Sequence, residues 1–217
     1  MRPPRLPALI GLLVVGCLPK PRADTTRYYL LTAVQPHTPS SRQTQSSSAL
    51  PLLGLGPVEL PRYLDRSELV SRPGPNQLQV ADDDRWGEPL VEGFRRNLRQ
   101  DLAEFLGTDR IVAYPFQASN RPELVLTIDV SRFEPVGIDA RQAELVARWN
   151  LRTGQGRVLA TDETTVREPI SGDGGQGAEV AALSRALARF AGLLGSAVRG
   201  GAARYVTSDK DREGHAR

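Results

Sequence analysis

Two stretches of the chain repeat their apolar residues with the period of an α-helix. Apolar side chains recur at three- and four-residue steps from Val91 to Phe105 and again from about Ala178 to Val198, a spacing that places them on one side of a helix. Gly107 follows the first stretch and Gly200-Gly201 follows the second, and glycine is common just beyond the C-terminus of a helix. The pattern therefore predicts two main α-helices that end at these glycines.

The segments before and between these helices have the pattern of β-strands. Residues 69–71 and 77–80 flank a turn-forming segment and predict a hairpin. Apolar residues alternate over 124–130 and 144–151, and a third run follows at 157–166. These three runs predict an antiparallel meander with one packed face. The apolar run 50–60 is interrupted by a proline, which cannot donate to a strand ladder, so we expect an edge strand or one with a bulge.

The order of these elements indicates the fold class. Because the helices do not alternate regularly with the strands, the sequence predicts an α+β fold, in which an antiparallel or mixed β-sheet is packed by two main α-helices in a single domain. We expect the domain to cover residues 28–199, opening with the β-prone run Tyr28-Tyr29-Leu30-Leu31 and interrupted at 32–49 by a flexible excursion rich in serine. Residues 200–217 have little to bury, and we expect a disordered tail.

The N-terminus has the features of a secretory signal. Arg2 and Arg5 precede a short apolar run at residues 8–15, and the small residue Gly16 follows it. A positive start, an apolar core of this length and a small residue are typical of a signal peptide, and the run is too short to span a bilayer as a helix. We therefore interpret residues 1–16 as a signal peptide, and residues 17–27 as the tether that follows it.

Cys17 is the only cysteine of the chain and stands directly after this signal. Val14-Val15-Gly16-Cys17 resembles a bacterial lipobox, which implies that Cys17 receives a diacylglyceryl group, becomes the new N-terminus and is then acylated with a fatty acid such as palmitate. Several acyl chains together anchor a protein durably to a membrane. Leu18 follows where an aspartate would favour inner-membrane retention, so the resemblance implies outer-membrane delivery. The alternative is a secretory signal cut elsewhere, with Cys17 as an ordinary thiol.

The charge of the chain does not favour nucleic-acid binding. The formal net charge of +3 falls to +1 once Arg2 and Arg5 leave with the signal. Only Lys20 and Lys210 of the 28 basic residues are lysine, but the arginines are interrupted throughout by acids. A nucleic-acid surface needs its basic residues clustered on one face. We therefore expect no nucleic-acid partner.

The side chains needed for catalysis or metal binding are scarce. His37 and His215 fall in the serine-rich excursion and in the tail, where the fold cannot hold a general base in place. With one cysteine, neither a disulfide nor a cysteine-based zinc site can form. The acidic runs Asp82-Asp83-Asp84 and Asp162-Glu163 could bind a cation, but contiguous carboxylates point in different directions, and a solvated helix start or loop explains them better. We expect no enzyme activity, cofactor or metal.

Two further features of the sequence each allow two interpretations. Gly172 to Gly177 fits the dinucleotide-binding pattern G-x-G-x-x-G. No strand follows the helix after it, and no acid stands about twenty residues on, so a flexible loop is the better interpretation. Trp149 shares the apolar face of its strand and is expected in the core, whereas Trp86, near a helix start, is the better candidate for a partner-facing aromatic.

Four runs together resemble one known family. They are Tyr28-Tyr29-Leu30-Leu31, Val58 to Arg66, Arg85 to Leu90 leading into the first helix, and Arg132-Phe133-Glu134 at the end of a strand. In this order, after a lipidated cysteine, they are similar to the ABC-type transport auxiliary lipoproteins of the paraquat-inducible protein C type.

The resemblance implies a non-enzymatic periplasmic lipoprotein of the outer membrane. Members of the family act with tunnel-forming MCE-type proteins and inner-membrane ABC transport components to move lipids or other hydrophobic compounds, in support of envelope integrity. Ring-like self-association follows by the same analogy, and Cys17 matches the anchor position. The alternatives are a periplasmic lipid-binding chaperone or outer-membrane assembly lipoprotein, and a hydrolase that uses carboxylates at Asp82 to Asp84.

Overall fold

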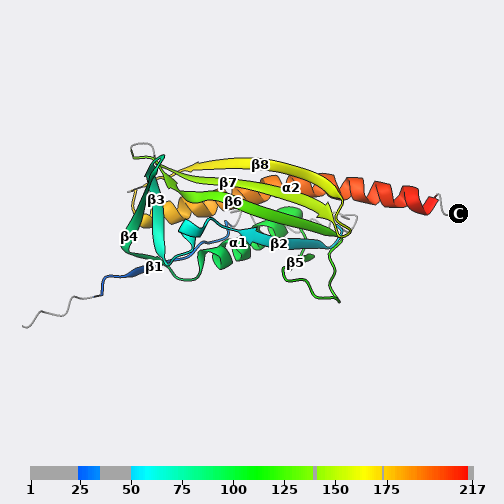
Figure 1. Cartoon of the computed structure of the whole chain (residues 1–217), viewed down its shortest axis with the longest axis horizontal. Coiled ribbons are helices and arrows are strands. Elements are labelled where there is room, and N and C mark those ends of the chain that lie inside the picture. The colour runs from blue at the N-terminus through cyan, green and yellow to red at the C-terminus, as the bar shows by residue number, and fades with distance from the viewer. Residues whose placement is uncertain (1–23, 35–49, 139–140, 173, 215–217) are drawn as a thin grey trace, which may run out of the picture.

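The computed structural model describes residues 24–34, 50–138, 141–172 and 174–214, so the predicted signal peptide, Cys17 and most of the serine-rich excursion lie outside the described residues. One mixed sheet and two helices make up the body (Figure 1). In chain order the elements are β1 (Arg27–Tyr29), β2 (Leu53–Glu59), the short 3-10 helix η1 (Arg62–Leu64), β3 (Glu68–Gly74), β4 (Gln77–Trp86), α1 (Leu90–Leu106), β5 (Ile111–Ala113), β6 (Leu124–Val136), β7 (Gln142–Thr153), β8 (Val158–Pro169) and α2 (Gln176–Gly214).

The sheet contains both parallel and antiparallel pairs. Its strands follow the order β1-β4-β3-β6-β2-β5, and β7 joins β6 on the other side and carries β8. The predicted hairpin is the antiparallel pair β3–β4, and the predicted meander is the antiparallel run β6–β7–β8. Strand β2 runs parallel to β5 and β6. The predicted α+β class, with a mixed sheet packed by two helices, is therefore confirmed.

Strand β6 has two neighbours along one edge. Strand β2 pairs with its first half, from Leu124 to Asp129, while β3 pairs with its far end at Val136. None of the described strands pairs with the edge of β6 between these two pairings, and η1 occupies this part of the fold. The Tyr63 hydroxyl oxygen lies 3.4 Å from the Ser131 carbonyl oxygen. The chain between β2 and β3 thus takes the place of a missing strand.

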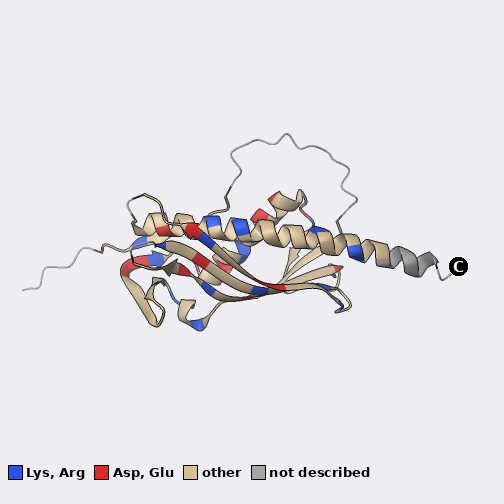
Figure 2. Ribbon diagram, turned by 90° about the horizontal axis from the view of Figure 1, so that it is seen from above, with Lys and Arg blue, Asp and Glu red and all other residues tan. Residues whose placement is uncertain are grey.

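The two helices cover the sheet and contact each other. Helix α1 ends at Gly107, which has a positive φ of 67°, as its placement in the sequence predicts. Phe94 of α1 is fully buried and its ring meets Phe133 of β6 edge-on at 5.1 Å. Helix α2 runs along the meander (Figure 2). Trp149 is 6% exposed and lies in the core, in agreement with the prediction.

The second helix is longer than predicted. Gly200-Gly201 does not end it, because α2 continues to Gly214 and its last turns project past the sheet (Figure 1). A Cβ atom added at Gly201 would stand 2.4 Å from Leu151 Cδ2, and Ala202 is buried. Gly201 therefore lets the helix approach β7 closely, and the expected disordered tail is wrong for residues 200–214.

One other local prediction needs correction, and a second is confirmed. Asp82-Asp83-Asp84 lies in β4 and not at a helix start, since α1 begins at Leu90 with Pro89 before it. For the run 50–60, the prediction of an edge strand or one with a bulge is confirmed by the bulge between Leu55 and Val58. Strand β5 pairs only with Leu53 to Leu55, so β6 is the one described strand that pairs with β2 beyond the bulge.

Candidate functional site: a groove beside Trp86

A groove of about 570 Å³ lies between two segments of the chain. One wall comes from η1 and its flanks, and the other from the end of β4 and the start of α1. The lining residues are Leu60, Arg62, Leu64, Asp65, Arg66, Ser67, Trp86, Gly87, Glu88, Pro89, Leu90 and Val91. These are the two runs that resemble the family at 58–66 and 85–90, which the fold brings face to face.

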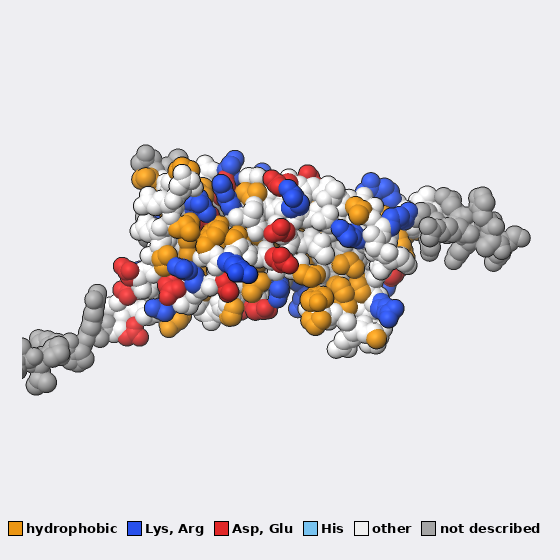
Figure 3. Space-filling view, viewed as in Figure 1, with side chains coloured by type: hydrophobic (Ala, Val, Ile, Leu, Met, Phe, Trp, Pro, Cys, Tyr) orange, Lys and Arg blue, Asp and Glu red, His pale blue; other side chains and the backbone are white. Residues whose placement is uncertain are grey.

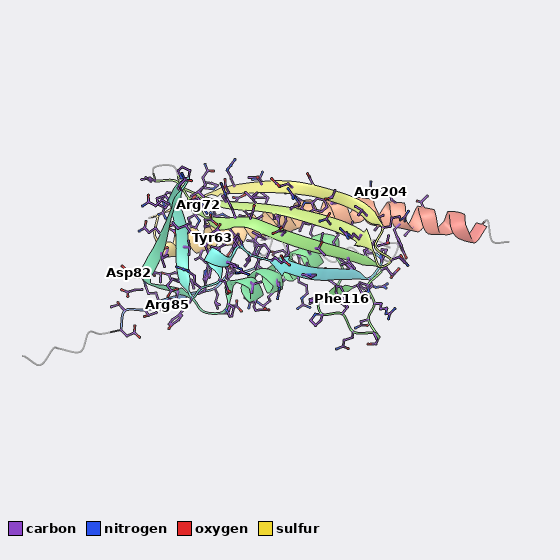
Figure 4. All side chains as sticks on the ribbon, in the orientation of Figure 1. Tyr63, Arg72, Asp82, Arg85, Phe116 and Arg204 are labelled. Carbon is purple, nitrogen blue, oxygen red and sulfur yellow. The ribbon has the colours of Figure 1, made fainter. Side chains whose placement is uncertain are left out.

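The groove has an apolar base. Leu64, Trp86 and Leu90 each expose less than a tenth of their surface and belong to the hydrophobic core. Apolar side chains gather on the face of the molecule that carries η1 (Figure 3), around the position at which Tyr63 is labelled in Figure 4. Trp86 is 8% exposed and forms a wall of the groove, so it is less exposed than its position near a helix start predicts, and its contact with a partner stays a prediction.

The rim of the groove is charged. Arg62 and Arg66 are exposed, and neither forms an ion pair within 4 Å with a residue that the structure describes. Asp65 stands between them. On the opposite wall, Glu88 binds Arg96 of α1 at 2.6 Å. An apolar base with an arginine-bearing polar rim is the composition of a protein-binding surface.

A buried carboxylate holds the η1 wall in place. Glu134 of β6 is fully buried, and it accepts hydrogen bonds from the Tyr63 hydroxyl at 2.9 Å and from Arg72 Nε at 2.7 Å. The Arg72 guanidinium also lies 5.4 Å from the centre of the Tyr63 ring (Figure 4). Burial, together with the negative charge of Glu134, raises the pKa of Tyr63 to about 12. Tyr63 therefore stays protonated, and its hydroxyl remains a donor at any physiological pH.

The N-terminal segment pairs with the wall of the groove that the end of β4 forms. Strand β1 pairs with the last residues of β4, and the Gly87 amide donates to the Tyr29 carbonyl oxygen at 2.8 Å. Arg27 makes two hydrogen bonds to the buried Asp84, at 2.7 and 2.8 Å. The chain that leads from the predicted anchor thus reaches the fold at the groove itself.

Beyond β1 the same segment runs between the two helices. Leu31 is buried there, and its carbonyl oxygen accepts a hydrogen bond from Asn97 Nδ2 of α1 at 3.1 Å. The amide of Thr32 donates to Ser184 Oγ of α2 at 3.2 Å. The N-terminal segment therefore contacts the sheet and both helices, so that a pull on the anchor would act directly on the body of the domain.

The other residues considered for chemistry do not form a site. His37 and His215 lie outside the described residues. Asp84 is paired with Arg27 and Glu163 with Arg148. Within the described ranges no group of three or more histidine, cysteine or acidic side chains could hold a metal ion. The loop that fits G-x-G-x-x-G follows the antiparallel strand β8 and not a parallel β–α unit.

Helix α2 is the one described helix whose length and composition would allow it to cross a membrane. Its most apolar stretch is 56% buried inside the fold, where it packs against the meander and α1. The core helix of a folded domain passes the same test, so this feature alone is weak evidence for a membrane span.

These features define a class: an α+β domain without a described catalytic cluster, with one exposed groove and an N-terminal segment fixed beside it. A family model described as "ABC-type transport auxiliary lipoprotein component" matches residues 29–193. The chain belongs to this family, which therefore identifies it as an auxiliary lipoprotein of an ABC-type transport system. Such auxiliary components are generally non-catalytic, and a lipoprotein family implies a lipid anchor in a membrane.

The fold recurs in solved structures. Protein XCC0632 from Xanthomonas campestris, a DUF330 protein, aligns with a TM-score of 0.64 and 21% identity, over 87% of this chain and 99% of its own. A crystal structure of an uncharacterized protein aligns with a TM-score of 0.62 and 20% identity, over 79% of this chain and 97% of its own. At this identity the two likenesses establish the fold alone. No curated protein matches the chain.

The sequence did not indicate a groove. Residues 60–67 and 86–91 carry no local signal of contact, because the two walls meet only after β3 and β4 have paired. The one available clue was that both segments carry the resemblance to the family.

Proposed function

We propose that this protein is an outer-membrane-anchored, non-enzymatic subunit that docks an MCE-type tunnel protein of an ABC transport system through the groove beside Trp86. The transported compounds would be lipids or other hydrophobic molecules, and the complex would support envelope integrity. The observation that carries the proposal is the convergence of two family-like runs, 58–66 and 85–90, on one groove. If members of a family share a contact with a partner, the residues that form the contact are expected in the sequence runs that the members have in common.

The position of the groove supports a docking role. It adjoins the β1–β4 pair, through which the lipid anchor is joined to the domain. Cys17 is seven residues before the first described residue, Asp24, so the tether can extend by roughly 25 Å at about 3.5 Å per residue. A lipidated Cys17 would keep the groove near the membrane and leave it open to a partner that crosses the periplasm.

A photo-crosslinking experiment tests the docking. A photoreactive benzoylphenylalanine replaces the exposed rim residue Ser67 in the full-length lipidated protein, in its native membranes. The matched control places the same group at Asp162, which is exposed on β8. We expect the Ser67 variant, and not the control, to capture an MCE-type protein. Products that contain only outer-membrane assembly factors would contradict the proposal.

A charge reversal gives an independent test of the same surface. Arg62→Glu with Arg66→Glu alters two exposed rim residues without removing core contacts, so the fold should be kept. We expect co-purification with the transport components to fall by about tenfold, since two repulsive rim charges weaken a contact by more than 1.4 kcal/mol. Arg152→Glu, on an exposed position of β7, is the matched control. Equal losses in both variants would contradict a specific role of the rim.

The size of the groove makes a lipid-binding chaperone the second candidate function. About 570 Å³ lies within the range of small-ligand pockets, and the apolar base could hold part of an acyl chain. Lipid covalently attached at Ser67 in the crosslinking experiment, without a protein partner, would favour this function. We also propose ring-like self-association of the lipidated chain, which sedimentation of the protein in mild detergent would test.

A further inference from the structure

A loop at the other end of the molecule carries exposed aromatic residues. Residues 114–123, here called the aromatic loop, lead from β5 to β6 and project from the body (Figure 1). Tyr114 is 57% exposed, and its ring meets the ring of Phe116 edge-on with 5.7 Å between their centres. An aromatic side chain this exposed contributes little to the core and is available for a contact outside the domain.

The aromatic loop is held firmly at its base. The amide of Tyr114 donates to the Leu55 carbonyl oxygen at 2.9 Å. A Cβ atom at Gly54 would stand only 2.6 Å from Phe116 Cζ and 2.7 Å from Pro122 Cγ. Glycine at position 54 therefore lets Phe116 and Pro122 pack onto β2 (Figure 4). The ring of Tyr114 is presented on a fixed platform, so little conformational entropy is lost when it is buried.

The chemistry of the aromatic loop matches the surface of a bilayer. The aromatic loop contains one cation, Arg121, and one acidic residue, Glu123, at its end beside β6. There Glu123 lies 3.9 Å from Arg110 and accepts a hydrogen bond from the Leu52 amide. Arg121 is exposed and forms no ion pair within 4 Å with a described residue. Tyrosine is favoured at the level of lipid headgroups, where its ring meets the acyl chains and its hydroxyl stays in water, and a neighbouring arginine is attracted to anionic headgroups.

The placement of the loop favours a membrane over other partners. The N-terminal segment leaves the body, and the aromatic loop projects, on the same lower side in Figure 1, while β7 and β8 form the upper side. The lipid anchor of the family keeps a bilayer next to the domain. One exposed tyrosine cannot hold a free protein on a membrane, but a tethered element needs only a weak affinity because its effective concentration is high.

We infer that the aromatic loop is a membrane-contacting element, which inserts Tyr114 into the headgroup region of the bilayer that carries the lipid anchor and places Arg121 against anionic headgroups. Together with the anchor at the opposite end, this contact fixes the orientation of the domain on the membrane. The inference depends on the lipid anchor and not on the partner of the groove, so either can fail without the other.

A fluorescent label on the loop tests the inference. Lipidation blocks the Cys17 thiol, so Tyr114→Cys provides the only free thiol of the mature lipidated protein. The variant is labelled with the environment-sensitive dye NBD and inserted into vesicles of phosphatidylethanolamine and phosphatidylglycerol. We expect a blue-shifted emission and about twofold quenching by lipids that carry a nitroxide near the headgroup. The matched control is Asp162→Cys, labelled on the upper side at β8, which should show neither effect.

Two further outcomes decide the matter. Adding Arg121→Glu to the labelled Tyr114→Cys protein should reduce the quenching, because an anionic loop is repelled by phosphatidylglycerol. Quenching at position 114 no greater than at the Asp162 control would overturn the inference. A blue shift without quenching by nitroxide lipids would also overturn it, since the label would then be buried against protein and not lipid.

Discussion

Two buried glutamates show how differently the groove end and the meander are held together. At the groove, Glu134 joins Tyr63 of η1 and Arg72 of β3, two residues that are more than 60 positions away in the chain. In the meander, Glu144 of β7 accepts hydrogen bonds from Arg132 of β6 at 2.8 Å and Arg167 of β8 at 2.7 Å. The first glutamate joins η1, which has no strand ladder, to the paired strand β3, whereas the second lies between strands that are paired with each other.

The partners of the two glutamates differ in their access to water. The side chain of Arg72 is 16% exposed, while those of Arg132 and Arg167 are 46% and 60% exposed. Although burial opposes it, the two guanidinium groups hold the pKa of Glu144 below its ordinary value. We therefore expect the network around Glu134 to contribute more to stability than the network around Glu144, because η1 has no backbone ladder to hold it in place.

Replacing each of the two buried glutamates by alanine should give the largest difference in stability between the groove end and the meander. Glu134→Ala leaves Arg72 buried without its partner, and we expect a loss of about 3–5 kcal/mol in the free energy of unfolding. Glu144→Ala leaves two arginines that water can solvate, and the loss should be about 1 kcal/mol. Urea denaturation of the soluble Cys17→Ser protein measures both. Equal losses would show that the groove end has no special dependence on its network.

A change of pH should change the contribution to stability of a third buried carboxyl group, that of Asp101, which lies beside the N-terminal segment at Val34. Asp101 of α1 is 8% exposed, and its Oδ2 has no hydrogen-bond partner in the described structure. Burial raises the pKa of Asp101 to about 6, against a hydrogen bond from the Val34 backbone that lowers it. Between the unfolded value of 3.8 and about 6, the folded protein binds the proton more tightly. The contribution of this group to stability therefore falls as the pH rises through that window.

Asp101→Asn tests this assignment. The amide removes the buried charge but keeps an acceptor for Val34, so we expect the variant to be more stable than the parent protein by about 2 kcal/mol at neutral pH. Near pH 4 the advantage should be much smaller, because Asp101 is then largely protonated in the folded protein. Thermal unfolding at a series of pH values measures the difference. A constant difference at all pH values would indicate a packing effect and not titration.

The smallest effects are expected at two adjacent glycines, where α2 crosses the meander. Gly201→Ala places a methyl group against Leu151 in the core, and we expect a loss of about 1–2 kcal/mol. Gly200→Ala meets no atom within 4 Å, so it should gain about 0.5–1 kcal/mol from better helix propensity and a less flexible unfolded chain. Thermal unfolding of the two variants should show shifts of opposite sign. Stabilisation by both would mean that the helix does not approach β7 closely.

The elements with a regular period followed from the sequence. The apolar stripe from Val91 to Phe105 lies within α1, and the alternating runs form the meander, because a period of 3.6 or 2 selects one buried face wherever the element is placed. The end of α1 at Gly107 was also predictable from local sequence, because the helix ends at a residue with positive φ and glycine adopts that conformation readily. The candidate anchor Cys17 and the bounds of the segments before residue 24 stay predictions.

Elements that depend on distant neighbours were not predictable. The acidic run of β4 has no period, and only the pairing of Asp84 with Arg27 of β1 shows why a buried acid is tolerated there. For β2, the proline predicted an edge strand or a bulge, and only the pairing with β6 shows that the bulge is the one present at Pro57. Phe105 was predicted in the core stripe, but it is 38% exposed and covers Gly195 of α2.

By itself, the sequence determined the two helices, the meander and the α+β class, because each depends on a period that neighbouring residues set. Only the tertiary structure decided that Gly201 packs α2 against Leu151 and does not end the helix. It also decided that Trp86 faces a groove, since the opposite wall comes from η1, some twenty residues earlier in the chain. Contacts across a fold depend on which surfaces meet, and no local pattern records them.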